Sequence, residues 1–371
     1  MEFTVSKDDF SPLLQKVASV IPMRTSLPML YNIVIESGKN KITVKATDLD
    51  ISIRGECKAE VKNKGKIAIQ GKVLSDFIRE YTEEEINISG DEGHIEIKSK
   101  RGKYSFSGVS EEEFPKLPDI DVKNVVEIPG GVIRRMVRKS QLAVARDDSR
   151  PALSGILWRG KGEEMVMVAT NGHLLSKVSY SGFKNAKFNF DVIVPPKAFD
   201  NFLKLYGDSE DDVKVAFSKD ILFFLLDEVI LTARLIEGPY PNFEQVIPTN
   251  NDKKIIIDKE MFLQLIRQSS ILASNITHQI KLSFSSLGTV KISATNFDIG
   301  TQAEDEMDVD YKGDDLEIAY NSNYLLDILK HIDTDKALME LSSSEKAGVV
   351  RAVSYAENED YLYLIMPLRL A

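Results

Sequence analysis

Apolar positions along the chain follow two spacings, which predict two kinds of element. Three segments repeat apolar side chains every three or four residues, the spacing of an amphipathic helix: residues 8–20, 131–145 and 259–273. Shorter runs alternate apolar and polar side chains instead, as at residues 42–46, 95–99 and 290–294. That alternation is typical of a strand with one buried and one hydrated face. Because strands outnumber helices, we expect an α+β protein with antiparallel sheets.

The order of these elements is repeated three times along the chain. A strand-like run ends in Ala-Thr-Asp or Ala-Thr-Asn at Thr47, Thr170 and Thr295, which lie 123 and 125 residues apart. A second helix-like segment follows each marker, at residues 72–81, 197–206 and 323–332. A proline-containing segment at residues 114–118 recurs at residues 240–248, with Pro115 and Pro241 separated by 126 residues. Three independent markers therefore share one period.

A period of about 125 residues is the size of a whole domain. We therefore expect three domains, at residues 1–120, 121–250 and 251–371. In each of them a strand, a helix, several strands, a second helix and further strands follow in order. Each domain should consist of two helices packed on antiparallel sheets.

The composition is that of an ordinary globular protein, with 371 residues of which 43% are hydrophobic and 28% are charged. Cys57 is the single cysteine, so the chain forms no internal disulfide. The start of the chain lacks the basic and apolar regions of a signal peptide. Its most apolar stretches, residues 221–226 and 361–368, are far shorter than the roughly 18 residues that span a bilayer. We expect a cytoplasmic protein without a membrane span.

The chain offers no recognisable catalytic or metal-binding motif. Its four histidines lack metal-ligand spacing, and one cysteine is too few for a thiolate zinc site. Gly65 and Gly71 do not form a phosphate-binding loop, since Val73 stands where serine or threonine would hold magnesium. Asp147 and Asp148 are adjacent, so their carboxylates should point apart and face solvent. We therefore expect no catalytic residue, no metal and no cofactor.

The three repeats are equivalent, and none has the features of an active site that the others lack. This favours a scaffold over an enzyme. One alternative is an enzyme that acts on a small acidic or neutral substrate, with the loop around His173 as its site. A second alternative is a monomeric binding module that uses the second repeat alone. A catalytic assay of His173→Ala would test the first alternative, and partner binding by residues 121–250 alone would test the second.

The formal net charge of −10 is distributed unevenly. The first repeat carries 18 basic and 20 acidic residues, the second 17 and 17, and the third 12 and 20. Residues 130–146 contain five cations and no acid: Arg134, Arg135, Arg138, Lys139 and Arg146. Acidic residues collect in loop-like runs at 111–113, 208–212 and 304–310. This basic helix either has its charged face exposed to solvent, or it lines a concave surface that neutralises the phosphates of a nucleic acid without contacting its bases.

Several motifs give the chain a specific resemblance to one family. They are Thr25-Ser-Leu-Pro-Met-Leu-Tyr-Asn32, Ser149-Arg-Pro-Ala-Leu-Ser-Gly155, Ala169-Thr-Asn-Gly-His173, Glu237-Gly-Pro-Tyr-Pro241 with Val246-Ile-Pro248, and Met366-Pro-Leu-Arg-Leu370. Over its whole length the chain resembles the bacterial DNA polymerase III beta subunit, or sliding clamp. The resemblance implies a head-to-tail homodimeric ring of six similar domains, with sheets outside and helices lining a hole for duplex DNA. A net-acidic ring is compatible with a basic hole, because the acids can lie outside.

The resemblance also implies a function and partners. A clamp of this family is a non-catalytic processivity factor that encircles double-stranded DNA without sequence specificity. It tethers its partners through a short peptide that lies in an apolar cleft between the second and third domains, which raises their effective concentration. The implied partners are the DNA polymerase III alpha subunit, the clamp loader and other proteins with a clamp-binding motif.

The resemblance assigns residues to three surfaces. The peptide cleft corresponds to Leu153, Thr170, Gly172, His173, Leu175, Pro241, Val246, Asn321, Tyr324, Met366, Pro367, Leu368 and Arg369. The DNA-contacting positions correspond to Arg24, Lys72, Arg150 and Lys197. The dimer joint corresponds to Tyr104 and Phe106 on an edge strand of the first repeat, and to Ile271 and Leu272 on the first helix of the third.

The chain departs from the family pattern at a few of these positions. Leu174 and Gln245 stand where the family often has arginine, or another polar residue after the histidine, which implies a less charged rim of the cleft. Pro151 and Ala152 replace aromatic residues that some members have near the DNA.

Overall fold

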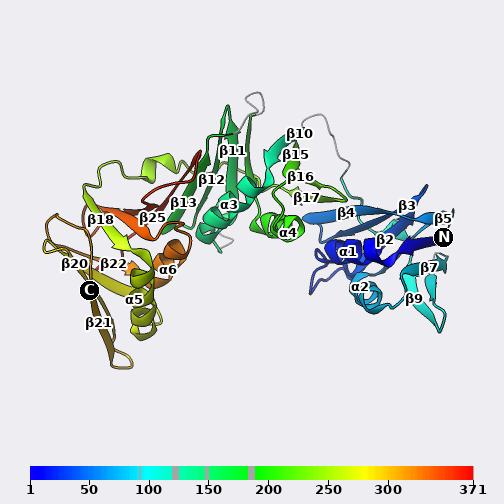
Figure 1. The fold of residues 1–371 in the computed structure, drawn as a ribbon, viewed down its shortest axis with the longest axis horizontal. Coiled ribbons are helices and arrows are strands. Elements are labelled where there is room, and N and C mark those ends of the chain that lie inside the picture. Colours follow the sequence, from blue (N-terminus) through cyan, green and yellow to red (C-terminus); the bar gives the residue numbers. More distant parts are fainter. Residues whose placement is uncertain (92, 119–124, 147–149, 183–188, 371) are drawn as a thin grey trace. The chain divides into compact units, whose positions relative to one another are not determined.

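The computed structural model describes residues 1–91, 93–118, 125–146, 150–182 and 189–370 (Figure 1). Asp147 and Asp148, the paired acids considered above, lie outside the described residues. The chain forms two compact bodies. The first consists of Met1–Gly131 and Lys197–Leu235, and the second of Val132–Pro196 and Ile236–Ala371.

The predicted order of elements is confirmed in every repeat, with one helix after the first strand and a second helix before the last strands. In the described residues the α-helices are α1 (Lys7–Ala18), α2 (Gly71–Glu80), α3 (Gly130–Ser140), α4 (Pro196–Tyr206), α5 (Lys259–Leu272) and α6 (Ser322–Lys330). Helix α1 packs against α2, and α5 packs against α6. Among the described helices, none is long and apolar enough to cross a membrane.

At the start of α1, α5 and α6 a side-chain oxygen accepts a hydrogen bond from a backbone N–H of the first turn. The Ser6 hydroxyl accepts from the N–H of Asp8 at 3.2 Å before α1. Asp258 accepts from the N–H of Met261 at 2.9 Å before α5. A helix start leaves its first N–H groups without a backbone partner, so these oxygens stabilise the ends by roughly 1 kcal/mol each.

Helix α3 is shorter than the segment 131–145 that the periodicity predicted. It ends at Ser140, and the chain continues as the 3₁₀ turn η4 (Gln141–Ala143). The Ser140 hydroxyl donates to the carbonyl of Val137 at 3.3 Å. A serine that bonds to the preceding turn competes with the helical hydrogen bonds, which favours an end of the helix at this position.

Thirteen strands of the first body form one antiparallel sheet within the described residues (Figure 1). Their order is β10-β15-β16-β17-β4-β3-β2-β6-β9-β8-β7-β1-β5. Their bounds are β1 (Glu2–Ser6), β2 (Asn32–Ser37), β3 (Lys41–Thr47), β4 (Ile51–Lys58), β5 (Glu60–Asn63), β6 (Gly65–Gln70), β7 (Glu85–Gly90), β8 (His94–Lys98), β9 (Lys103–Val109), β10 (Val125–Pro129), β15 (Asp212–Ser218), β16 (Ile221–Leu226) and β17 (Val229–Arg234).

The described part of the second body holds two antiparallel sheets. The larger has eight strands in the order β14 (Phe190–Val194), β11 (Ile156–Lys161), β12 (Glu164–Thr170), β13 (Leu174–Tyr180), β25 (Glu359–Ile365), β24 (Gly348–Ala352), β23 (Lys336–Leu341) and β18 (Lys253–Asp258). The smaller has four strands in the order β21 (Thr301–Asp308), β20 (Thr289–Asn296), β19 (Gln279–Ser285) and β22 (Leu316–Asn321).

In both bodies a sheet continues from one repeat into the next. Strand β17 of the second repeat pairs antiparallel with β4 of the first, with Leu231 opposite Ile53. Strand β25 of the third repeat pairs in the same way with β13 of the second, with Leu364 opposite Leu175. Neighbouring repeats are therefore joined by backbone hydrogen bonds as well as by the chain that links them.

The two faces of the first body's sheet differ in character. Ile42 and Val44 on β3, and Ile51 and Ile53 on β4, are buried on the face that α1 covers. Successive strand residues point to opposite faces. The other face of the same strands therefore carries polar side chains, among them Thr43, Lys45, Ser52 and Arg54.

Gly55 on β4 lets α1 lie close to the sheet. A Cβ added there would overlap Leu13 Cδ1 of α1 and lie 2.8 Å from Val229 Cγ1 of β17. We expect Gly55→Ala to lower the free energy of unfolding by roughly 1–3 kcal/mol, the usual cost of overpacking a core. Urea unfolding compared with Gly38→Ala measures this, because an added Cβ at Gly38 meets no heavy atom closer than 3.6 Å. Equal stability of the two variants would contradict the expectation.

Candidate functional site

A tight turn between β12 and β13 presents His173 at the surface. Gly172 has a φ of +90° there, a conformation that favours glycine. The Thr170 hydroxyl donates to the carbonyl of Leu174 at 2.8 Å. The side-chain oxygen of Asn171 accepts from the N–H groups of His173 and Leu174 at 2.9 and 2.8 Å. The turn is therefore fixed by its own hydrogen bonds, which leaves the His173 side chain exposed to solvent.

Two segments that are distant in sequence contact this turn. The N–H of Met366, just after β25, donates to the carbonyl of His173 at 2.8 Å. The Asn171 amide nitrogen lies 3.5 Å from the Tyr324 hydroxyl of α6. The turn of the second repeat is thus bonded to two segments of the third.

The last residues of the chain run beside β22. The N–H of Leu368 donates to the carbonyl of Ala319 at 2.7 Å. Asn321 ends this strand, and its side chain accepts from the N–H of Asn323 at 2.9 Å to begin α6. The turn-and-tail surface is our name for the exposed and half-buried residues of these segments: Thr170, Gly172, His173, Asn321, Tyr324, Met366, Pro367, Leu368 and Arg369.

A buried apolar cluster lies on one face of the eight-stranded sheet. Its members are Leu157, Val166, Val168, Leu175, Ile193, Phe243, Val349, Leu362 and Leu364. Tyr240 and Ile247, on the segment that connects the second repeat to the third, pack against it. Burial raises the pKa of the Tyr240 hydroxyl, which therefore stays neutral at neutral pH.

The structure divides the predicted cleft residues into two groups. Leu175 is 2% exposed, and Leu153 is also buried, so these side chains support the surface from inside. Val246 is 57% exposed and Met366 39% exposed, and Pro241 is exposed as well. Side chains of the second group can contact a partner without a change in the fold, whereas those of the first group cannot.

Three of the predicted DNA-contacting cations lie in the first body. Arg24 is exposed in the segment after α1, and Lys72 and Lys197 are exposed in the first turns of α2 and α4. The Lys197 ammonium is paired with the almost fully buried carboxylate of Asp48. Asp48 also accepts from the N–H of Ile51 at 2.7 Å, so the carboxylate is held in place from two sides.

The fourth predicted DNA-contacting cation, Arg150, lies in the second body next to the turn described above. A Cβ placed on Gly172 would lie 3.5 and 3.6 Å from the two terminal nitrogens of the Arg150 guanidinium. Its exposed charge is therefore available to a ligand of the turn-and-tail surface, which the sequence did not indicate.

The predicted joint residues lie at two apolar surfaces, one in each body. Tyr104 and Phe106 lie on the part of β9 that pairs with β8. The last two residues of β9 pair with β6. Their rings lie 4.8 and 5.2 Å from that of Phe77. In the second body Ile271, in the last turn of α5, is 74% exposed, and Leu272 is half-buried.

Among the described residues, no three histidine, cysteine, aspartate or glutamate side chains are grouped so that they could hold a metal ion. Cys57 is buried on β4, where burial raises the pKa of its thiol to about 12. A thiol with such a pKa is a poor nucleophile.

Comparisons with known proteins cover the whole chain. Three family models match it in order, described as the DNA polymerase III beta subunit, N-terminal domain (residues 1–118), central domain (127–242) and C-terminal domain (244–369). The beta sliding clamp of Chlamydia pneumoniae is 30% identical over 371 residues, which is 100% of this chain and 99% of the relative. The chain belongs to the beta sliding clamp family.

Further relatives agree with this assignment. The beta sliding clamp of Staphylococcus epidermidis is 28% identical over 379 residues, covering 100% of this chain and 99% of the relative. A crystal structure of the DNA polymerase III subunit beta from Pseudomonas aeruginosa is similar with a TM-score of 0.94 and 28% identity, and each chain is covered completely. The resemblance read from the sequence motifs is confirmed, and with it the function of a DNA sliding clamp in replication.

The predicted position of Leu174, one of the residues that differ from the clamp family pattern, was wrong. Leu174 was expected at the rim of the cleft, but its side chain is 1% exposed. It shares a strand face with Ser176, whose hydroxyl donates to the carbonyl of Lys139 at 2.7 Å under α3. Leu174 is therefore part of the core, whereas Gln245 is exposed as expected for a rim position.

Some cations of the basic segment at residues 130–146 of this sliding clamp form ion pairs within the second body. The Arg135 guanidinium pairs with Glu359 at 2.7 Å. The Lys139 ammonium is buried, pairs with Asp333 at 2.7 Å and lies 4.8 Å from the ring centroid of Tyr361. Two of the five cations therefore pair with acids of the third repeat, Lys139 from a buried and Arg135 from an exposed position, and Arg138 and Arg146 are exposed as well.

Proposed function

We propose that this chain is the non-catalytic processivity factor of a bacterial replicase and that it works as a closed ring in the cytoplasm. Two copies joined head to tail would enclose duplex DNA, with domain boundaries near residues 120 and 250 of each copy. The observation that carries the proposal is the match of all three repeats, in order, to the beta subunit models.

Two different apolar surfaces support the proposed joint. One consists of Tyr104 and Phe106 at the open edge of β9, and the other of Ile271 and Leu272 at the end of α5. A contact between unlike surfaces of two copies is heterologous, and it ends in a ring when the rotation closes. Such closure would cover an unpaired strand edge and exposed aliphatic side chains, both of which otherwise favour aggregation.

The cations of the first body suggest how DNA would be held. A phosphate that approaches Lys197 must compete with the carboxylate of Asp48. We therefore expect weak direct affinity, and retention that depends on the closed ring. A clamp loaded on a nicked circle should stay there at salt concentrations that screen phosphate contacts, and it should leave once the circle is linearised. The sequence of the DNA should not matter.

Reducing the positive charge at Arg24, Lys72 and Lys197 should impair loading and sliding together. We would use Arg24→Glu, Lys72→Glu and Lys197→Gln, because a glutamate at position 197 would repel Asp48. The dependence of binding on log salt should decrease by roughly one for each lost phosphate contact. Loading on a nicked circle and salt titration with a short duplex measure the two effects.

The matched control for this variant has the same charge change on exposed lysines elsewhere: Lys254→Glu, Lys312→Glu and Lys346→Gln. If the control loses as much DNA binding as the test variant, overall charge rather than these positions is responsible. If neither variant differs from the unmodified chain, the three residues do not contact DNA.

The proposed partner site is the turn-and-tail surface together with Pro241 and Val246. These two residues belong to the segment that connects the second repeat to the third. Val246, Met366 and Leu368 would contact apolar side chains of a bound peptide. The polar groups of His173, Asn321, Tyr324 and Arg369 would orient its backbone. The Arg150 guanidinium next to Gly172 would attract a carboxylate of the peptide.

The two alternatives have less support from the geometry. A module made of the second repeat alone would lack Met366 and Tyr324, which bond to the His173 turn. In the part of the chain that the structure describes, His173 makes its hydrogen bonds through its backbone, so nothing favours a catalytic imidazole.

A further inference from the structure

A groove in the first body lies on the polar face of the sheet, opposite α1. It encloses about 540 Å³ and is lined by β2, β3, β4, β6 and β17 and by the segment at residues 111–118. An adjacent hollow of about 700 Å³ shares Lys66, Glu111 and Glu112 in its wall. These three side chains therefore form a wall that the two hollows have in common. We refer to the first of them as the first-body groove.

The repeats show why this groove exists. Val34, Lys45 and Ser52 lie 123 residues before Leu157, Val168 and Leu175, the same spacing as Thr47 and Thr170. In the second body those three leucine and valine side chains fill a buried cluster. In the first body the corresponding cluster is reduced to Val34, Ala68 and Phe114, with Met29 and Leu117 packed against it. A lysine and a serine thus replace core residues, and the space stays open to water.

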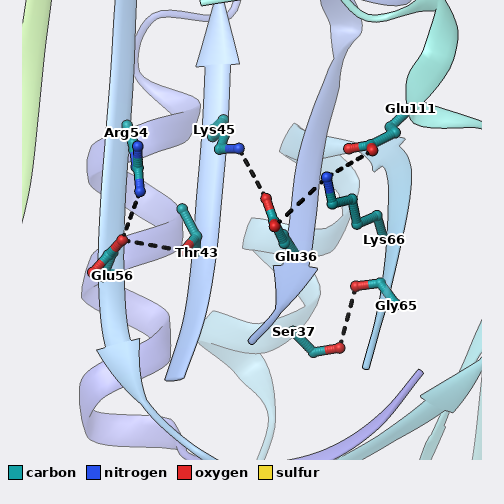
Figure 2. A network of polar contacts seen from close by, with 9 residues as sticks. All are labelled: Glu36, Ser37, Thr43, Lys45, Arg54, Glu56, Gly65, Lys66 and Glu111. Carbon is teal, nitrogen blue, oxygen red and sulfur yellow. Dashed lines mark hydrogen bonds and ion pairs between the residues drawn. The ribbon is translucent and has the colours of Figure 1, made fainter. Parts of the chain in front are cut away.

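The polar side chains around the groove form two groups of ion pairs, which Figure 2 shows from close by except for Lys41. The Glu36 carboxylate accepts from Lys45 at 2.9 Å and lies 3.6 Å from Lys66. Lys66 also lies 2.9 Å from Glu111. Arg54 lies 2.9 Å from Glu56, which also pairs with Lys41 at 2.6 Å.

The groove and its surroundings carry slightly more positive than negative charge. Four cations and two carboxylates line the groove: Lys45, Arg54, Lys66, Lys116, Glu111 and Glu112. Beside it, Glu36 and Glu56 pair with these cations and with Lys41, which gives five cations against four carboxylates. Partial burial by itself would raise the pKa of Glu36, but the neighbouring Lys45 and Lys66 outweigh it and lower that pKa. The carboxylate therefore stays ionised at neutral pH, and Glu36 and Glu111 together hold Lys45 and Lys66 in place.

We propose that the first-body groove binds an extended acidic peptide segment of a partner protein. Carboxylates of the peptide would bind between Lys45, Lys66 and Arg54, which already hold carboxylates of this chain in that geometry. An apolar side chain between them would pack against Leu117 and Ile230 in the groove wall. The proposal concerns a different surface from the turn-and-tail surface and does not depend on it.

A peptide fits this groove better than a nucleic acid. Glu36, Glu56, Glu111 and Glu112 lie among or beside the cations and would repel a continuous row of phosphates. An acidic peptide can place its carboxylates only at the cations and turn apolar or amide groups toward the glutamates. A phosphate backbone binds through its charge, so it would gain no affinity from the apolar part of the wall.

The probe is a labelled pentapeptide, Asp-Glu-Ile-Glu-Asp, compared with its uncharged twin Asn-Gln-Ile-Gln-Asn by fluorescence anisotropy on the full chain. The acidic peptide should bind at least tenfold more tightly than the twin, and salt should weaken it. Lys45→Gln with Lys66→Gln should reduce its affinity at least tenfold. The control Lys254→Gln with Lys312→Gln, which makes the same change of charge on exposed lysines, should reduce it less than twofold.

Three further measurements keep the proposal open to refutation. Glu36→Gln with Glu111→Gln removes competing carboxylates and should tighten binding at least threefold, even if the lysine variant proves unstable. Unchanged affinity would overturn the proposal.

Met366→Ala with Leu368→Ala should leave binding intact, and loss of binding there would place the peptide on the turn-and-tail surface instead. Duplex DNA that displaces the peptide and loses affinity in the lysine variant would show a nucleic-acid site and would also overturn it.

Discussion

Replacing Ile271 and Leu272 with alanine should convert the dimer into monomers. Ile271 is 74% exposed in the chain by itself, so its truncation hardly affects the folding of one copy. In a closed ring both side chains would be buried at each of two joints, where truncation costs roughly 2–5 kcal/mol per residue if burial is complete. Sedimentation velocity at sub-micromolar concentration measures the change.

The matched control for the joint is Leu287→Ala. Leu287 is 89% exposed in the turn between β19 and β20 of the same body, and it has no part in the proposed joint. It should leave the dimer intact. Tyr104→Ala with Phe106→Ala should dissociate the dimer from the other side of the contact. A dimer that survives the Ile271 and Leu272 substitutions at sub-micromolar concentration would rule out this joint.

Met366→Ala with Leu368→Ala should abolish partner binding without opening the ring. Both substitutions keep the backbone bonds from Met366 to His173 and from Leu368 to Ala319, so the tail stays attached. What is lost is apolar area on the turn-and-tail surface. We expect the affinity for a labelled peptide with adjacent leucine and phenylalanine to fall at least tenfold, or about 1.4 kcal/mol. Processive synthesis on a loaded clamp should fall with it, while retention on a nicked circle persists.

Leu370→Ala provides the control for the tail, because Leu370 is exposed in the same segment but lies beyond the predicted site. Its peptide affinity should equal that of the unmodified chain. The assignment of the surface is wrong if the Met366 and Leu368 variant binds the peptide within about threefold of the unmodified chain. Loss of retention on the circle would show that the variant damages the ring instead.

The repeat and the α+β class could be predicted because both depend on local signals. Thr47, Thr170 and Thr295 each follow an alternating run, and helix periodicity recurs at fixed distances from them. The pairing of β17 with β4 could not be predicted in this way, since periodicity identifies a strand but not the edge that it joins. The end of α3 at Ser140, where the serine hydroxyl bonds to the preceding turn, is likewise not visible in an apolar pattern.

The candidate site was predicted less completely, for reasons of burial and of pairing. The resemblance identified Leu153 and Leu175 as cleft residues but could not distinguish a supporting side chain from an exposed one. A charge count could not show that Arg135 pairs with Glu359, because the two residues lie 224 positions apart in the sequence. The position of Arg150 next to Gly172 likewise depends on the fold of the turn, not on sequence distance.

The pairing of β4 with β17 has a consequence for synthesis of the protein. Strand β4 ends at Lys58 and β17 begins at Val229, about 170 residues later. At about 5–20 residues per second, a ribosome would leave the β4 edge without its partner for roughly 10–35 s. An open edge of this kind can pair with another nascent chain. A chaperone that shields the first repeat during this interval should therefore raise the yield of folded protein more than one supplied after the chain is released.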